Sequence, residues 1–175
     1  MPEDTHPSTH PPLPPTTEDD RVSWLRLLRS RRVGPSTFYR LMGEHGSAQA
    51  ALLALPEVAK AAGVENYSPC PEGVAQAELR AAKAAGARMI CVSDPHYPAD
   101  LQQIPDAPPI LWAIGDLSIL ARPMIALVGA RNASSLGLRM AKALATDLAA
   151  RGHVVVSGLA RGIDTAAHTA TLEKG

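Results

Sequence analysis

Hydrophobic residues recur along the chain with two different periods, and the change falls near residue 87. Before it, apolar positions follow a helical spacing. The segment EDDRVSWLRLLRS (residues 18–30) has acidic residues in its first turn and apolar Val22, Leu25 and Leu28. This combination predicts an amphipathic helix.

The next segments continue the helical pattern. RSRRVGPSTFYRLMGEHGSAQAALLALPE (residues 29–57) predicts short helices around Gly34-Pro35 and a turn at His45-Gly46. This rhythm is typical of helix-hairpin-helix and SAM-like modules. GVAQAELRAAKAAGA (residues 73–87) predicts a further helix that stops at Gly86.

After residue 87 the period shortens to that of strands. Four runs of strong β-propensity each end at a Gly, Ser or Asp: RMICVS, ILWAIG, MIALVG and HVVVSG. SLGLRMAKALATDLAARG, a helical pattern, lies between the last two, so residues 124–158 predict a βαβ crossover. The strands are apolar nearly throughout, as in parallel sheets covered on both faces. We expect an α/β fold, a Rossmann-like doubly wound parallel sheet that is incomplete, with the four strands in one sheet.

Two glycine-containing loops are expected at one edge of this sheet. GARNASSLG (residues 129–137) follows the third strand and SGLARGID (residues 157–164) follows the fourth. In open parallel sheets, ligands bind beyond the carboxyl ends of the strands, near helix N-termini. Each loop carries one arginine, Arg131 or Arg161, so the pair of loops favours a site for phosphate groups.

For each residue of these loops a structural role stands beside the binding role. The glycines, Gly129, Gly158 and Gly162, either let amides approach an anion or serve turns and helix packing. Ser134 and Ser135 either donate to a phosphate or cap a helix.

Two further residues follow the second loop along the chain. Asp164 caps its helix or orients Arg161. His168, about one turn later, is a packing residue or a functional one.

The distribution of charge and the two cysteines indicate which partners and which compartment the protein suits. Seventeen basic residues balance seventeen acidic ones, but six arginines and no acid lie in residues 21–40. That basic run is either a backbone-binding surface or a solvated face. Cys70 and Cys91 have no metal or disulfide spacing and fit a reducing cytosol.

The N-terminal segment and the hydropathy of the chain indicate the cellular location that we expect. Residues 1–20 contain six prolines and predict a disordered tail with no signal peptide. No apolar run is long enough to span a bilayer. We therefore expect a cytoplasmic protein without a membrane partner.

Motifs of catalysis are missing from the sequence. There is no G-x-G-x-x-G, no Walker lysine, no G-x-S-x-G elbow and no cluster with metal-ligand spacing. We expect no enzyme activity, no cofactor and no metal.

IALVGARNASSLG and VVVSGLARGIDTAAH, with the lead-in of residues 94–116, resemble the DNA-processing protein A family (DprA, also called Smf). The resemblance implies a SAM-like domain and then a Rossmann-like domain that binds single-stranded DNA. It also implies a dimeric mediator of recombination in natural transformation that helps to load RecA. It places Gly129, Arg131, Ser157, Gly158, Arg161 and Gly162 at the DNA backbone.

The resemblance also sets the expected domains and one departure. We expect a tail over residues 1–20, a SAM-like helical domain over 21–70, and the N-terminal part of the Rossmann-like domain over 71–175. Ala130 stands where the family usually has serine. The chain stops just after the signature helix, so we expect a truncated chain, and we expect a homodimer in the full-length protein.

Two other functions are compatible with parts of this pattern. One is a Rossmann-like enzyme such as a nucleoside-monophosphate phosphoribohydrolase, whose PGGxGTxxE loop does not occur in these residues. The other is a dinucleotide-dependent oxidoreductase, which the missing G-x-G-x-x-G argues against.

Overall fold

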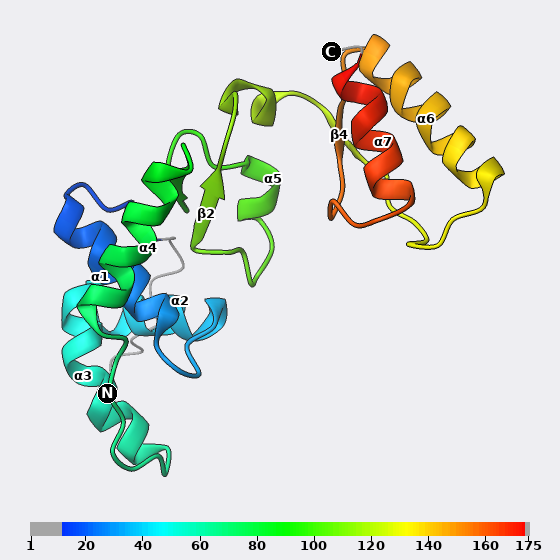
Figure 1. The fold of residues 1–175 in the computed structure, drawn as a ribbon. Helices are drawn as coiled ribbons and strands as arrows, with labels where there is room; N and C mark the ends of the chain where they lie inside the picture. The colour runs from blue at the N-terminus through cyan, green and yellow to red at the C-terminus, as the bar shows by residue number, and fades with distance from the viewer. Residues whose placement is uncertain (1–11, 174–175) are drawn as a thin grey trace, which may run out of the picture. The chain divides into compact units, whose positions relative to one another are not determined.

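The computed structural model describes residues 12–173, which form two compact units divided between Gly115 and Asp116 (Figure 1). The tail predicted over residues 1–20 lies mostly outside the described residues, and helix α1 already begins at Glu18. The domain boundary expected near residue 70 stays a prediction.

The first unit is mainly helical. Its helices are α1 (Glu18–Arg29), α2 (Pro35–His45), α3 (Ala48–Ala61) and α4 (Glu72–Ala84), with a short α5 (Ala99–Gln102). The predicted helices of residues 18–30, 29–57 and 73–87 are thus confirmed. Local chemistry explains their ends: Thr17 and Asp20 form a reciprocal capping box at α1, and Gly86, with φ of +72°, follows α4.

The helices of this unit pack around a few large side chains. Phe38, Leu25, Leu27 and Leu41 are fully buried, and the rings of Trp24 and Phe38 meet edge to face at 5.1 Å. Of the three apolar positions that predicted the first helix, Val22 and Leu25 are buried and Leu28 is half-buried.

Strands β1 (Arg88–Cys91) and β2 (Ile110–Ala113) also belong to the first unit, where they pair antiparallel with Cys91 opposite Ile110. Cys91 is buried, as predicted, and desolvation raises the pKa of its thiol to about 12.

The second unit contains a βαβ crossover. A 3₁₀ turn η1 (Leu117–Ala121) leads into β3 (Met124–Ala126), α6 (Ser135–Ala150), β4 (Val154–Val156) and α7 (Ile163–Leu172). Strands β3 and β4 pair in parallel, with Ile125 opposite Val155. The predicted crossover of residues 124–158 is confirmed.

Helices α6 and α7 pack closely on each other and on β4 (Figure 1). Their shared core is built from small side chains, Ala145, Val155, Ala167 and Ala170.

The expectation of one four-stranded parallel sheet is wrong for the described residues. The four strands form two separate two-stranded sheets, one antiparallel and one parallel. Apolar runs predict strands but not their partners. The architecture shown is a helical region followed by an α/β region with small sheets.

Candidate functional site

The loops after β3 and β4 lie side by side in the second unit. We call residues 127–134 the β3 loop and residues 157–162 the β4 loop. Strand pairing extends beyond β3, because the amide of Leu127 donates to the carbonyl of Val156 at 2.9 Å. Both loops therefore leave the same edge of the parallel pair, as the sequence predicted (Figure 1).

Asp164, near the start of α7, joins the two loops. Its side chain is buried, with the residue 4% exposed. One carboxylate oxygen accepts from the amide of Gly129 at 3.2 Å. The other accepts from the amides of Gly158 at 3.1 Å and Ala160 at 3.4 Å. One side chain thus fastens backbone from both loops.

The hydrogen bonds decide the ionisation of this carboxyl. Desolvation raises the pKa of Asp164, but donation by the amides of Ala160, Gly129 and Gly158 lowers it further than desolvation raises it. The net pKa lies below the ordinary value of 3.8, so the group is a carboxylate at neutral pH.

Gly162 meets the β3 loop where a side chain would not fit. Its φ is +87° and its ψ is −121°, a region open essentially to glycine. A Cβ would overlap the carbonyl oxygen of Ala130 and lie 2.6 Å from that of Arg131. The close approach predicted from the sequence is present, but its partner is the backbone of the other loop.

The other two glycines differ from each other. A Cβ on Gly129 would lie 2.7 Å from Cγ1 of Ile163, so the helix start packs against this position. A Cβ on Gly158 would meet nothing closer than the Asp164 carboxylate at 3.5 Å, an ordinary contact.

These contacts correct one sequence-based interpretation. The amides of Gly129 and Gly158 already donate to Asp164, so they are not the anion cradle that the glycine pattern suggested. At the start of α7, the amide of Ile163 donates to the Ala130 carbonyl at 3.3 Å. Gly162 lets the β4 loop pack on the β3 loop, and Gly129 lets Ile163 at the start of α7 pack on the β3 loop.

Ser157 and His168 form a pair beneath the β4 loop. The hydroxyl oxygen of Ser157 accepts from the amide of Leu159 at 3.0 Å and lies 2.7 Å from Nε2 of His168. This contact supports the structural role for the half-buried His168. Leu159, whose amide donates to Ser157, has a left-handed conformation with φ of +52°.

Ser134 is the N-cap of α6. Its hydroxyl oxygen accepts from the amide of Gly137 at 3.2 Å. The next amides, those of Ser135 and Leu136, have no hydrogen-bond acceptor within residues 12–173. They form the free N-terminus of a 16-residue helix, where the macrodipole favours an anion.

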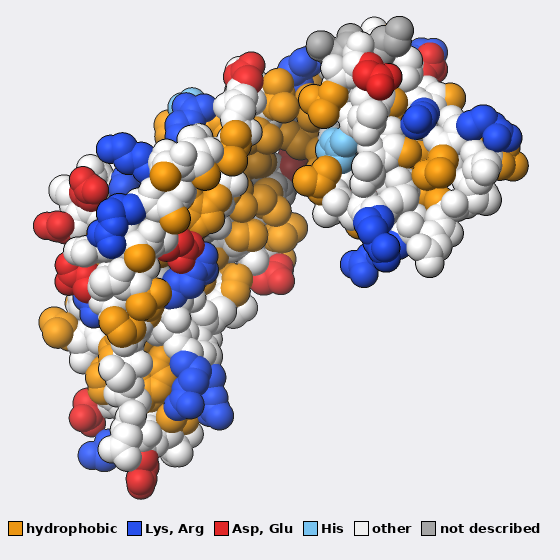
Figure 2. All heavy atoms as spheres, viewed as in Figure 1, with side chains coloured by type: hydrophobic (Ala, Val, Ile, Leu, Met, Phe, Trp, Pro, Cys, Tyr) orange, Lys and Arg blue, Asp and Glu red, His pale blue; other side chains and the backbone are white. Residues whose placement is uncertain are grey.

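Arg131 and Arg161 are exposed, one on each loop. Neither guanidinium has a hydrogen bond or ion pair with any other described residue, and the expected alternative in which Asp164 orients Arg161 is not what the structure shows. Figure 2 shows Lys and Arg side chains at the edge of the second unit where the loops lie.

Two residues of this region were missed at the level of sequence. Ile163 packs on Gly129, and the hydroxyl of Thr165 donates to the Ala160 carbonyl at 2.7 Å. Threonine hydroxyls commonly bond to nearby backbone, so the contact of Thr165 has a local signal, whereas nothing in the sequence pairs Ile163 with a glycine 34 positions earlier.

The arginine run of residues 21–40 has a different environment in the first unit. Arg29 makes a bidentate ion pair with Glu78 at 2.9 and 2.7 Å. Arg21 donates to the Met89 carbonyl at 3.3 Å. These contacts join α1 to α4 and β1.

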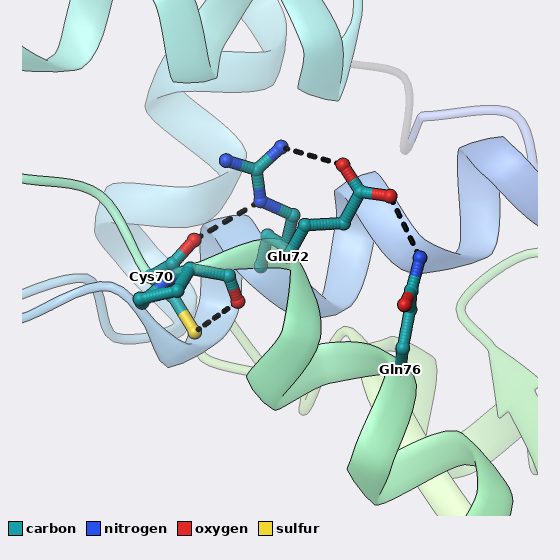
Figure 3. Close-up of polar contacts among 5 residues, drawn as sticks. Cys70, Glu72 and Gln76 are labelled. Carbon is teal, nitrogen blue, oxygen red and sulfur yellow. Dashed lines mark hydrogen bonds and ion pairs between the residues drawn. The ribbon is translucent and has the colours of Figure 1, made fainter.

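Two further arginines of the run have partners. Arg26 donates to the Cys70 carbonyl at 3.0 Å and lies 4.0 Å from Glu72, which also accepts from Gln76 (Figure 3). Arg40 pairs with Glu44, one turn later on α2. Much of the basic run therefore stabilises the helical unit itself.

No helix in residues 12–173 is long and apolar enough to cross a membrane. Over the same residues, no three His, Cys, Asp or Glu side chains are grouped so that they could hold a metal ion.

Comparisons with known proteins match both parts of the chain. Residues 18–81 match the family described as the DprA-like N-terminal HHH domain. Residues 88–175, half of the chain, match the family described as DNA recombination-mediator protein A.

Individual relatives carry corresponding names. DNA processing protein DprA of Streptococcus pneumoniae is 44% identical over 84 residues, 48% of this chain and 29% of the relative. DNA processing protein DprA of Bacillus subtilis is 36% identical over 96 residues, 54% of this chain and 32% of the relative. The matched segments thus span less than a third of either relative's length.

A solved structure resembles the fold as well. The crystal structure of DNA processing protein A from Streptococcus pneumoniae is 29% identical, with a TM-score of 0.52. The match covers 82% of this chain and 56% of that one. The chain belongs to the DNA recombination-mediator protein A family, known as DprA or Smf.

Proposed function

We propose that the β3 and β4 loops bind the backbone of single-stranded DNA through Arg131 and Arg161. The observation that carries this proposal is the contrast in partners. Both guanidinium groups are exposed without an internal acceptor in residues 12–173, on loops that Asp164 and Gly162 hold together. Arginine is the side chain best suited to a phosphate, which accepts two parallel N–H bonds from it.

The start of α6 adds a second kind of donor. The amides of Ser135 and Leu136 and the dipole of α6 favour a negative charge at the end of the β3 loop. The hydroxyl of Ser134 still has its proton to donate, since its oxygen only accepts from Gly137. The site residues are then Arg131, Arg161, Ser134 and the first amides of α6, with Gly129, Ser157, Gly158 and Gly162 shaping the loops.

For the complete protein we extend the proposal to the role that the family resemblance implies. It acts by binding rather than by catalysis, in a Rossmann-like domain, as a cytoplasmic recombination mediator. It forms a homodimer and helps to load RecA on incoming single strands.

The test is a fluorescence titration of labelled oligo-dT with the wild-type protein and with Arg131→Ala and Arg161→Ala. Each substitution should weaken binding by about 1–3 kcal/mol, the scale of charge-assisted hydrogen bonds. Arg151→Ala is the matched control, because this exposed arginine at the far end of α6 has Asp147 as its one ion-pair partner in the described part of the chain.

Two results would contradict the proposal. One is that both loop variants titrate like the wild type at moderate salt. The other is that a thymidine mononucleotide displaces the oligomer at equal phosphate concentration, which would favour the nucleotide-processing alternative.

A further inference from the structure

Asp164 is the point at which the two loops are joined, yet it has no ligand role in the proposal above. We propose that Asp164 is a positioning residue for DNA binding: its carboxylate holds Arg131 and Arg161 in a fixed mutual arrangement on their two loops. This inference rests on the proposed function and names the group that makes the two arginines act together.

The geometry requires a carboxylate at this position. Three backbone N–H groups from two loops converge on the two oxygens, at 3.1 to 3.4 Å. An ionised carboxylate only accepts, so both oxygens suit these donors. An asparagine amide has one accepting oxygen, and its NH₂ group would face one of the backbone N–H groups.

No other described contact replaces this one fully. The amide of Ile163 donates to the Ala130 carbonyl at 3.3 Å, which ties the β3 loop to α7. Within residues 12–173, however, hydrogen bonds link the β4 loop to the β3 loop only by way of Asp164.

The direction of the change in DNA affinity on replacing Asp164 distinguishes a positioning role from a simple effect of its negative charge. Removing a negative charge close to a polyanion should strengthen binding by Coulomb's law. Loss of the clamp should instead weaken binding, because each arginine would then have to be ordered separately when DNA binds.

The experiment compares Asp164→Asn with Asp147→Asn, which makes the same charge change on the exposed surface of α6. Oligo-dT affinity and hydrogen exchange of the Gly129 and Gly158 amides are measured on each. For Asp164→Asn we expect about tenfold weaker binding or more, and loss of protection at one or both of the glycine amides. For Asp147→Asn we expect unchanged protection and equal or slightly tighter binding.

The energetic coupling between Arg131 and Arg161 in DNA binding gives a second test of the positioning role of Asp164. In the wild type, the Arg131→Ala and Arg161→Ala effects should be non-additive, whereas in the Asp164→Asn background they should add. Unaltered coupling in a folded Asp164→Asn protein would overturn the proposal.

The outcomes distinguish this proposal from the proposed function. If Asp164→Asn leaves the glycine amides unprotected but binds as tightly as the wild type, the positioning role is overturned and the DNA site stands. If the wild type does not bind oligo-dT, the proposed function fails and the DNA role of Asp164 fails with it, while hydrogen exchange still measures the clamp. If Asp164→Asn does not fold, Asp164→Glu takes its place, because it keeps the charge; it must restore folding and part of the oligo-dT affinity. The proposal is overturned if Asp164→Glu folds and loses protection at the glycine amides, yet binds oligo-dT as tightly as the wild type.

Discussion

In the first unit, four arginines of the basic run donate to acceptors of the same unit, namely Arg21, Arg26, Arg29 and Arg40. Arg131 and Arg161 of the second unit have no acceptor in the described chain. Arg29 is engaged by Glu78 through two hydrogen bonds, and Glu78 also accepts from the indole of Trp112 at 3.0 Å. The same residue type is structural at these four positions of the first unit and has no internal acceptor on the two loops of the second. A count of basic residues would have pointed to the first unit, and the contacts point to the second.

The two units also reach their stability differently. The first buries large side chains such as Trp24, Leu25 and Phe38. The second has a core of alanines and Val155, and relies on close backbone approach at Gly162. Small side chains let helices and loops approach closely, so single added atoms matter more there.

The largest expected effect tests this reliance on close approach. Gly162→Ala should destabilise the second unit by about 2–4 kcal/mol, because it strains a glycine-only conformation and pushes against the Ala130 carbonyl. Thermal or denaturant unfolding measures the loss.

Gly158→Ala is the matched control within the same loop. This position has no positive φ and an added Cβ would lie 3.5 Å from Asp164, so the cost should stay below about 1 kcal/mol. Equal costs at the two positions would show that the β3 loop does not pack on Gly162 as described.

A smaller effect is expected from the arginines of the first unit. Arg29→Ala should lower stability by about 0.5–1 kcal/mol, since the pair with Glu78 is well aligned but partly exposed. It should leave oligo-dT affinity unchanged, the reverse of what Arg131→Ala does. A DNA-binding defect in folded Arg29→Ala protein would indicate that the basic run of residues 21–40 contacts DNA.

The pH dependence of stability at acidic pH gives a second test of the pair between Arg29 and Glu78. The hydrogen bond from Arg29 holds the pKa of Glu78 below its ordinary value of 4.5, against a smaller opposing effect of desolvation. A lowered folded-state pKa adds stability above the unfolded-state pKa, and this is lost as the pH falls through the folded-state value. The wild type should therefore lose its advantage over Arg29→Ala only below about pH 4.5.

Helices and the crossover could be predicted from sequence because their signals are local. Acidic first turns, Gly86 and the spacing of Val22 and Leu25 indicated the helices of the first unit. The glycines and arginines after β3 and β4 indicated two adjacent loops, because successive parallel strands end at one edge.

The remaining features depend on partners far apart in sequence. Short apolar runs do not specify whether β1 pairs with β2 or with β3, so the single sheet was wrong. Asp164 was recognised as a helix-start acid, but its bond to Gly129 joins residues 35 positions apart. The acceptor for a glycine amide cannot be read from the glycine itself.

The salt dependence of oligo-dT binding tests the central claim most directly. Neutralising phosphates of a single strand releases counterions, with a log–log slope of about −0.7 per phosphate contact. Binding should weaken steeply with salt and vary little with base sequence. The double variant Arg131→Ala/Arg161→Ala should have a slope shallower by about 1.4, with Arg151→Ala matching the wild type. Equal slopes for the wild type and the double variant would show that these two arginines do not contact the DNA backbone.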